Sequence, residues 1–224
     1  MAGFNLGRFE RVQASRAGYT VEVCANRSVE RALQPAPVVR ILPPPSLGRN
    51  RRPDAAPRIM ELPTAPDPRQ RLREMASDVA SAMEFMSARF GPPVLRSLAV
   101  SPVPGAFGQG FPGLLYVSTL SYLGPEDKPI RALTPAQRLF FAEILTAHET
   151  AHQWWGNLLG PAGYHDDWLM EALANYSALL FLEKRRGTRV LEATLDGYRQ
   201  SLLAKTEGGG IVDSIGPIIL GHRL

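Results

Sequence analysis

Apolar residues recur every three or four positions over several long stretches of the sequence, the spacing of a helix with one buried face. The first stretch spans residues 68–90, with Asp67 as the expected cap and Pro68 as the first helical residue. Its apolar stripe consists of Leu72, Met75, Val79, Met83, Met86 and Phe90. A second helix is predicted from Thr134 to about Gly156, with Gln137 placed to complete a capping box. Two more are predicted, from Asp166 or Asp167 to Arg186 and over residues 188–205.

Shorter segments have the composition and alternation of β-strands. Residues 19–24 alternate between apolar and polar side chains, and two further strands are predicted over 95–100 and 114–120, on either side of a turn-rich stretch. The pattern therefore predicts an α+β fold that is mostly helical and has a small sheet. We interpret residues 1–34 as a short β-rich piece, either the end of a β-rich N-terminal region or strands added to the domain that follows.

Residues 35–68 contain half of the twenty prolines, together with several arginines, and such a composition favours extended backbone over a packed core. We interpret this segment as a linker lying over the surface, with a recognition segment for a partner as the alternative. The remaining residues, 69–224, are expected to form the main domain. It ends without a closing element, so the chain is expected to be part of a longer polypeptide.

Composition excludes some classes of protein. The net charge of +4 is modest, and no basic stripe interleaved with aromatic residues is present, so a nucleic-acid-binding protein is not expected. The single cysteine, Cys24, rules out an internal disulfide. No signal peptide is visible, and the longest uncharged stretch, 97–125, is broken by prolines and glycines, so no membrane span is expected. The compartment is not determined, and the cytoplasm is taken by default.

Two histidines four residues apart, His148 and His152, lie in the second predicted helix and enclose Glu149 in the pattern His-Glu-x-x-His. Successive helical residues turn by about 100°, so the two imidazoles lie roughly 40° apart on one face and about 6 Å apart along the axis. Side chains so placed can share one Zn²⁺ per chain. Glu149 can then reach a metal-bound water without being a ligand, and can take its proton as the water attacks a carbonyl.

A third ligand is expected from the next helix. Eighteen residues separate His152 from Glu171, which lies near the start of that helix and points back at the histidines if the two helices pack antiparallel. His165 is the alternative ligand. Asn175, one turn after Glu171, is expected to support a ligand through a hydrogen bond.

The segments HETAHQWWGN and DDWLMEALANY, which carry these residues, resemble the zinc aminopeptidase family of membrane alanyl aminopeptidase and leukotriene A4 hydrolase, the gluzincins. The resemblance implies that His148, His152 and Glu171 are zinc ligands, that Glu149 is the general base, and that residues 69–224 form a thermolysin-like catalytic domain. Where the family has Trp-Leu-Asn-Glu-Gly around the third ligand, this chain has methionine and alanine in place of the asparagine and the glycine.

The resemblance also concerns the substrate. A strand just before the zinc helix can hold a peptide by edge pairing, so Gly113 and Leu114 are expected to bind substrate, and Gln109 either binds it or is a turn residue. Aminopeptidases of the family have Gly-x-Met-Glu-Asn here, and its glutamate binds the free amine of the substrate. Residues 105–113 read GAFGQGFPG and contain no acid. The family's oxyanion-stabilising tyrosine also has no counterpart, so this chain alone is expected to be a poor catalyst.

The expected function is zinc-dependent peptide-bond hydrolysis of the aminopeptidase kind, with a peptide or protein as the substrate. Two alternatives stay open. One is a non-catalytic zinc-containing module that binds peptides or acts as a scaffold. The other is an endopeptidase, or a hydrolase of a non-peptide substrate, that uses the same site.

Overall fold

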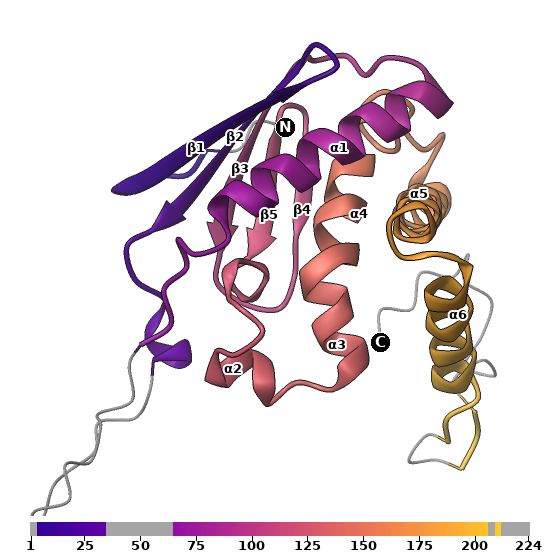
Figure 1. Ribbon diagram of the computed structural model, residues 1–224. Helices are drawn as coiled ribbons and strands as arrows, with labels where there is room; N and C mark the ends of the chain where they lie inside the picture. The colour runs from indigo at the N-terminus through magenta and orange to yellow at the C-terminus, as the bar shows by residue number, and fades with distance from the viewer. Residues whose placement is uncertain (1–3, 35–64, 206–208, 212–224) are drawn as a thin grey trace, which may run out of the picture.

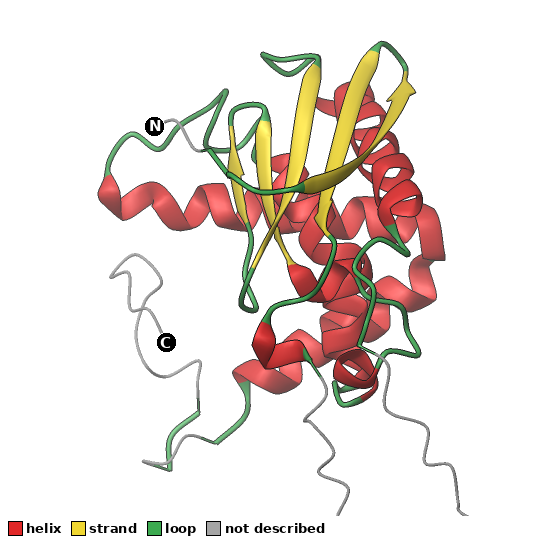
Figure 2. Ribbon diagram, turned by 90° about the vertical axis from the view of Figure 1, so that its left-hand side faces the viewer, coloured by secondary structure: helices red, strands yellow, loops and turns green. Residues whose placement is uncertain are grey.

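The computed structural model describes residues 4–34, 65–205 and 209–211, which form an α+β fold. A five-stranded mixed sheet has helices packed against one face, and α5 and α6 lie beyond α4, farther from the sheet (Figures 1 and 2). Most of the predicted linker lies outside the described residues. Within them, no helix is both long enough and apolar enough to cross a membrane.

The strand order in the sheet is β1-β2-β3-β5-β4. The strands are β1 (Phe9–Arg16), β2 (Tyr19–Asn26), β3 (Ser97–Val103), β4 (Gln109–Phe111) and β5 (Leu114–Ser118). β2, β3 and β5 run parallel, and each end of the sheet is closed by an antiparallel hairpin. The described strands of the N-terminal piece therefore extend the same sheet as β3 and β5. The domain boundaries themselves stay a prediction.

Each hairpin has a two-residue turn, and in each turn a glycine adopts the positive φ angle that the turn requires. β1 and β2 are joined at Ala17 and Gly18, whose φ angles are 50° and 81°. Positive φ at both turn residues matches the right-handed twist of the two strands. β4 and β5 are joined through Pro112 and Gly113, and the φ of Gly113 is 73°. This second hairpin places β4 at the edge of the sheet.

Helix α1 (Leu72–Phe90) covers the sheet with the apolar stripe expected from the sequence. Five of the six predicted stripe residues are buried, and Phe90 is partly buried against the same core. The helix begins later than expected. The carboxylate of Asp67 accepts a hydrogen bond from the backbone N–H of Arg69 at 2.9 Å, so it caps a preceding turn and not α1.

The helix that carries the His-Glu-x-x-His pattern is continuous but not uniform. It consists of α3 (Pro135–Leu139), a π-helical turn (Phe140–Ile144) and α4 (Leu145–Ala151). The expected capping box is present, with Thr134 and Gln137 each binding the other's backbone N–H. The helix ends at Ala151 and not near Gly156, and the residues between them form turns.

Two further long helices follow. As expected, α5 (Asp167–Arg186) ends at Gly187, which has a φ of 86°. α6 (Thr188–Leu202) is shorter than predicted, has no fully buried residue and packs on α5. The short elements are α2 (Lys128–Arg131) and the 3₁₀ turns Arg31–Leu33, Thr119–Tyr122 and Tyr164–Asp166.

Contacts at the two ends of α5 establish that it runs antiparallel to the helix with the histidines. At its C-terminal end, the Arg186 guanidinium lies 3.1 Å from the carboxylate of Glu143, which belongs to the π-helical turn. At its N-terminal end, the carboxylate of Glu171 lies 3.2 Å from His148. The antiparallel arrangement on which the third ligand depends is therefore present.

Candidate metal centre

Two histidines and one carboxylate converge at the junction of α4 and α5. His148 Nε2 lies 3.2 Å from His152 Nε2 and 3.2 Å from Glu171 Oε2, and His152 Nε2 lies 3.7 Å from Glu171 Oε1. Ligands held tetrahedrally about 2.0–2.1 Å from a zinc ion are separated from one another by about 3.3 Å. The two distances from His148 are close to this value, and the one from His152 to the other carboxylate oxygen is longer. These three residues form a group that could hold a metal.

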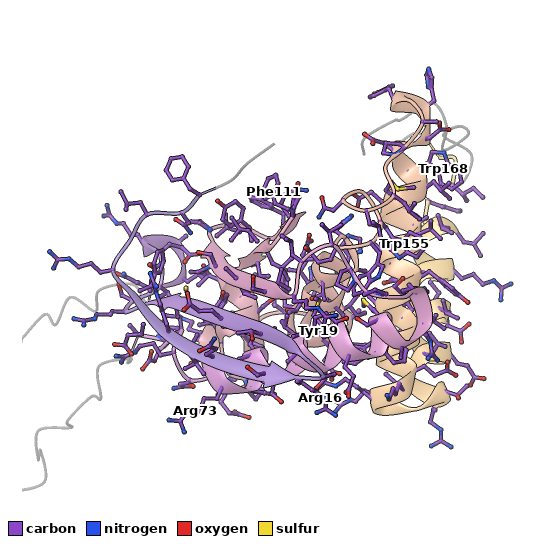
Figure 3. All side chains as sticks on the ribbon, turned by 90° about the horizontal axis from the view of Figure 1, so that it is seen from above. Arg16, Tyr19, Arg73, Phe111, Trp155 and Trp168 are labelled. Atoms are coloured by element: carbon purple, nitrogen blue, oxygen red, sulfur yellow. The ribbon has the colours of Figure 1, made fainter. Side chains whose placement is uncertain are left out.

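The ring of His152 is fixed by the turn that follows α4. Its Nδ1 lies 2.8 Å from the carbonyl oxygen of Trp155, a contact in which Nδ1–H is the donor. Nε2 is then the nitrogen whose lone pair faces the ligand group. Trp155 is in turn tied to α5, because its indole N–H donates to the hydroxyl of Ser177 at 2.8 Å, and Figure 3 shows it between the sheet and α5.

The protonation states of the group suit metal binding, which needs neutral imidazole and ionised carboxylate. Burial, more than any other effect, lowers the pKa of His152. The hydrogen bond with His148 is the main reason why the pKa of Glu171 is lowered. The Glu171 side chain is 64% exposed, so the group is open to solvent on the α5 side and leaves room for a further ligand or a substrate.

Glu149 lies beside the group, on the sheet side of α4. The residue is only 3% exposed. Burial is the largest influence on its carboxyl group and raises the pKa to about 7, although His148 and a hydrogen bond with the backbone of Gly110 act in the opposite direction. A buried carboxyl group with a pKa near neutrality suits a residue that takes up and returns a proton.

The β4–β5 hairpin is clamped to the residues that follow α4. Gln153, which is 5% exposed, donates to the carbonyl oxygen of Phe111 at 2.8 Å and accepts from the backbone N–H of Gly113 at 2.9 Å. The Asn157 amide donates to the carbonyl oxygen of Gly110 at 3.3 Å. Sequence analysis missed Gln153 and Asn157, because no local pattern reveals a side chain that binds a distant backbone.

The structure does not bring the three predicted substrate residues to the ligand group. Leu114 lies in β5, which is paired on both sides, so the edge strand is β4 and not the strand expected. Gly113 is in the hairpin turn and bound by Gln153. Side chains alternate along a strand, so Gln109 lies on the face opposite to Gly110, away from α4.

Two other predicted positions are resolved by their contacts. The side chain of Asn175 hydrogen-bonds with Tyr198 of α6, and no described contact links it to a ligand. The predicted hydrogen bond from Asn175 to a metal ligand is therefore not seen among the described contacts. His165 lies in the 3₁₀ turn Tyr164–Asp166 and packs on Tyr164. The ligand group includes Glu171 and not His165.

This arrangement, two histidines a helical turn apart with a carboxylate from a second helix and a buried acid between them, is typical of metal-dependent hydrolases. Residues 132–209 match a family model described as the Peptidase family M1 domain. The resemblance seen in the sequence is thereby confirmed for this segment. No curated protein matches the sequence.

Among solved structures, the chain is similar to the M1 zinc metallopeptidase from Deinococcus radiodurans, with 18% identity over 89% of this chain and 34% of that chain, and a TM-score of 0.49. It is also similar to a mutant of a two-domain M1 zinc metallopeptidase bound to L-arginine, with 17% identity over 91% of this chain and 35% of that chain, and a TM-score of 0.48. The chain thus spans about a third of the length of these structures.

The raised pKa of Glu149 predicts how the stability of the metal-free protein changes with pH. The folded protein keeps a proton on this carboxyl group up to a pKa of about 7, whereas the unfolded chain releases it near the ordinary value of 4.5. The free energy of unfolding, relative to that of a Glu149→Gln variant, should therefore fall by roughly 3 kcal/mol as the pH rises through this window, and level off above it.

Urea unfolding of the metal-free protein and of the variant, at about pH 4.5 and about pH 8, measures this difference and cancels the contributions of other groups. A difference that is the same at both pH values would contradict the prediction.

Proposed function

We propose that the chain holds one zinc ion through His148, His152 and Glu171, and that it hydrolyses peptide bonds in a thermolysin-like domain of the aminopeptidase kind. The observation that carries the proposal is the convergence of the three side chains, whose closest polar atoms lie 3.2 to 3.7 Å apart. The family match over residues 132–209 supports it. The antiparallel packing of α4 and α5 also supports it, because this packing already places Glu171 beside both histidines.

When bound, a zinc ion would lower the pKa of a water molecule and polarise a substrate carbonyl group. Glu149 is the residue of this chain that would accept the proton of the attacking water and return it to the leaving amine. It is buried and adjacent in sequence to a ligand, and the backbone of Gly110 orients its carboxylate. The nearby β4 strand covers it from the sheet side, so bulk water is kept from one flank of the carboxylate.

The substrate is proposed to approach from the open side of the group, along the edge of β4. The backbone of Gly110 on this edge already makes two hydrogen bonds, one with the Glu149 carboxylate and one with the Asn157 amide. A peptide that pairs with the edge at Gly110 therefore has to replace the bond from Asn157. We propose that this replacement aligns the scissile carbonyl, in place of the role first expected for Leu114.

Removal of one ligand tests the metal site. His148→Ala should lose the bound zinc, because two ligands remain and the tetrahedral set is broken, and the loss should exceed tenfold in the zinc dissociation constant. His165→Ala is the matched control, since it removes a histidine outside the group. Metal analysis of the three purified proteins gives the result, and equal zinc in wild type and His148→Ala would remove the metal-site assignment.

Removal of the base tests the reaction. Glu149→Ala in the full-length protein should keep its zinc and lose turnover by several orders of magnitude, because only the proton acceptor is missing. Zinc content and peptide hydrolysis are measured on the same preparation. A wild-type protein that binds zinc but hydrolyses no peptide would select the alternative of a non-catalytic module.

The acid-free hairpin segment favours a second candidate, an endopeptidase. Residues 105–113 offer no carboxylate that could bind a free amine. If this candidate is right, amine-blocked peptides are cleaved with a kcat/KM within a few-fold of that of free peptides. A preference of more than a hundredfold for free amines would support the aminopeptidase assignment instead.

A further inference from the structure

Two glycines of the β3–β4 segment lie directly against the helix that carries the proposed general base. A Cβ built at Gly108 would overlap the carboxylate of Glu149 and would lie 2.7 Å from its Cγ and Cδ. A Cβ built at Gly110 would lie 2.6 Å from the backbone oxygen of Glu149 and 2.6 Å from the Cβ of His152. Separations below 3.0 Å are essentially never seen for a real Cβ.

Neither glycine is needed for its backbone conformation. Positive φ angles occur at other glycines of the chain, such as Gly105 and Gly113, but not at Gly108 or Gly110. A residue with a side chain could adopt the same backbone if there were space for it. What these positions require is therefore the absence of a side chain, which lets backbone approach backbone closely.

The two positions differ in what occupies the space. At Gly110 the obstacles are backbone and the root of a ligand side chain, neither of which can move without separating β4 from α4. At Gly108 the obstacle is the flexible side chain of Glu149 from Cγ to Oε1, which moves only by adopting another rotamer. The hairpin cannot easily retreat instead, because Gln153 binds Phe111 and Gly113, and Asn157 binds Gly110.

We infer that Gly108 is a positioning residue: its missing side chain provides the space in which the Glu149 carboxylate is held at its working position. The inference rests on the proposed function of Glu149. It predicts that a single methyl group at this position displaces the carboxylate while the ligands and the fold stay in place. A displacement of about 1 Å at a catalytic group typically costs on the order of a hundredfold in rate.

The test is a double-variant cycle in the full-length, zinc-loaded protein. Gly108→Ala should lower kcat by about a hundredfold, with zinc content and thermal stability close to wild type and KM changed by less than about threefold. Glu149→Ala is far slower at the outset, but it lacks Cγ and every atom beyond it, so the added methyl group meets no Glu149 side chain. In that background Gly108→Ala should cost less than about threefold. If the fold-loss in kcat of the double variant equals the product of the losses of the two single variants, the inference is wrong.

Gly160→Ala is the matched control, because no atom lies within 4 Å of a Cβ built there, and it should leave both kcat and zinc unchanged. Gly110→Ala should instead lower zinc content, since its methyl group meets the root of His152.

A crystal structure of Gly108→Ala gives a reading that does not depend on activity. The Glu149 carboxylate should be displaced while β4 stays in place, and a displaced β4 with an unmoved carboxylate would overturn the inference. Failure of the proposed function is recognised separately, as a Glu149→Ala variant that retains turnover.

Discussion

The candidate metal centre depends on the antiparallel packing of α5 against the helix that carries the two histidines. This packing is pinned at both ends by charged groups. At one end Arg185 and Arg186 of α5 meet the largely buried Glu143, and Arg185 also pairs with Asp78 of α1 at 3.0 Å. At the other end Glu171 meets the histidines. A buried carboxylate is costly without a partner, so the pairing at Glu143 favours one register of the two helices, and this register delivers the third ligand.

The same helix is constrained from the opposite side by the sheet. β4 is an edge strand, and it lies so close to α4 that Gly110 within it and Gly108 just before it have no room for side chains. Gln153 holds the hairpin turn, and Asn157 holds the strand. The proposed base therefore lies between a strand that cannot retreat and a ligand group that α5 fixes. Its carboxylate is positioned by structure on both sides, which is the preorganisation that proton transfer needs.

The electrostatics of the centre are consistent with a cation. Glu171 raises the pKa of Glu149, although less than burial does, because its negative charge disfavours a second one nearby. The Nε2 atoms of His148 and His152 face each other at 3.2 Å. If both carry lone pairs, neither can donate a hydrogen bond to the other. A metal ion in the group would satisfy the lone pairs of both histidines and of Glu171 at once. The exposed side of Glu171 would leave room for a further ligand.

Much of this could be predicted from the sequence, because the relevant information is local. The stripe of α1, the capping box at Thr134 and the end of α5 at Gly187 all follow from residue spacing and backbone preference within a few turns. The ligand pair follows from the four-residue spacing on one helix. Glu171 followed from family resemblance together with an assumed antiparallel packing, which the structure contains.

Only the tertiary structure decided the rest. It placed β4, and not β5, at the edge, turned Gln109 away from α4, and tied Asn175 to Tyr198 of α6. It also revealed the close approach of Gly108 to Glu149, which are forty-one positions apart in the sequence (149 − 108). Hydrophobic periodicity tells which face of an element is buried, but not what lies against that face. Strand order, side chain to backbone clamps and steric space depend on distances between segments, and these are fixed only when the chain packs.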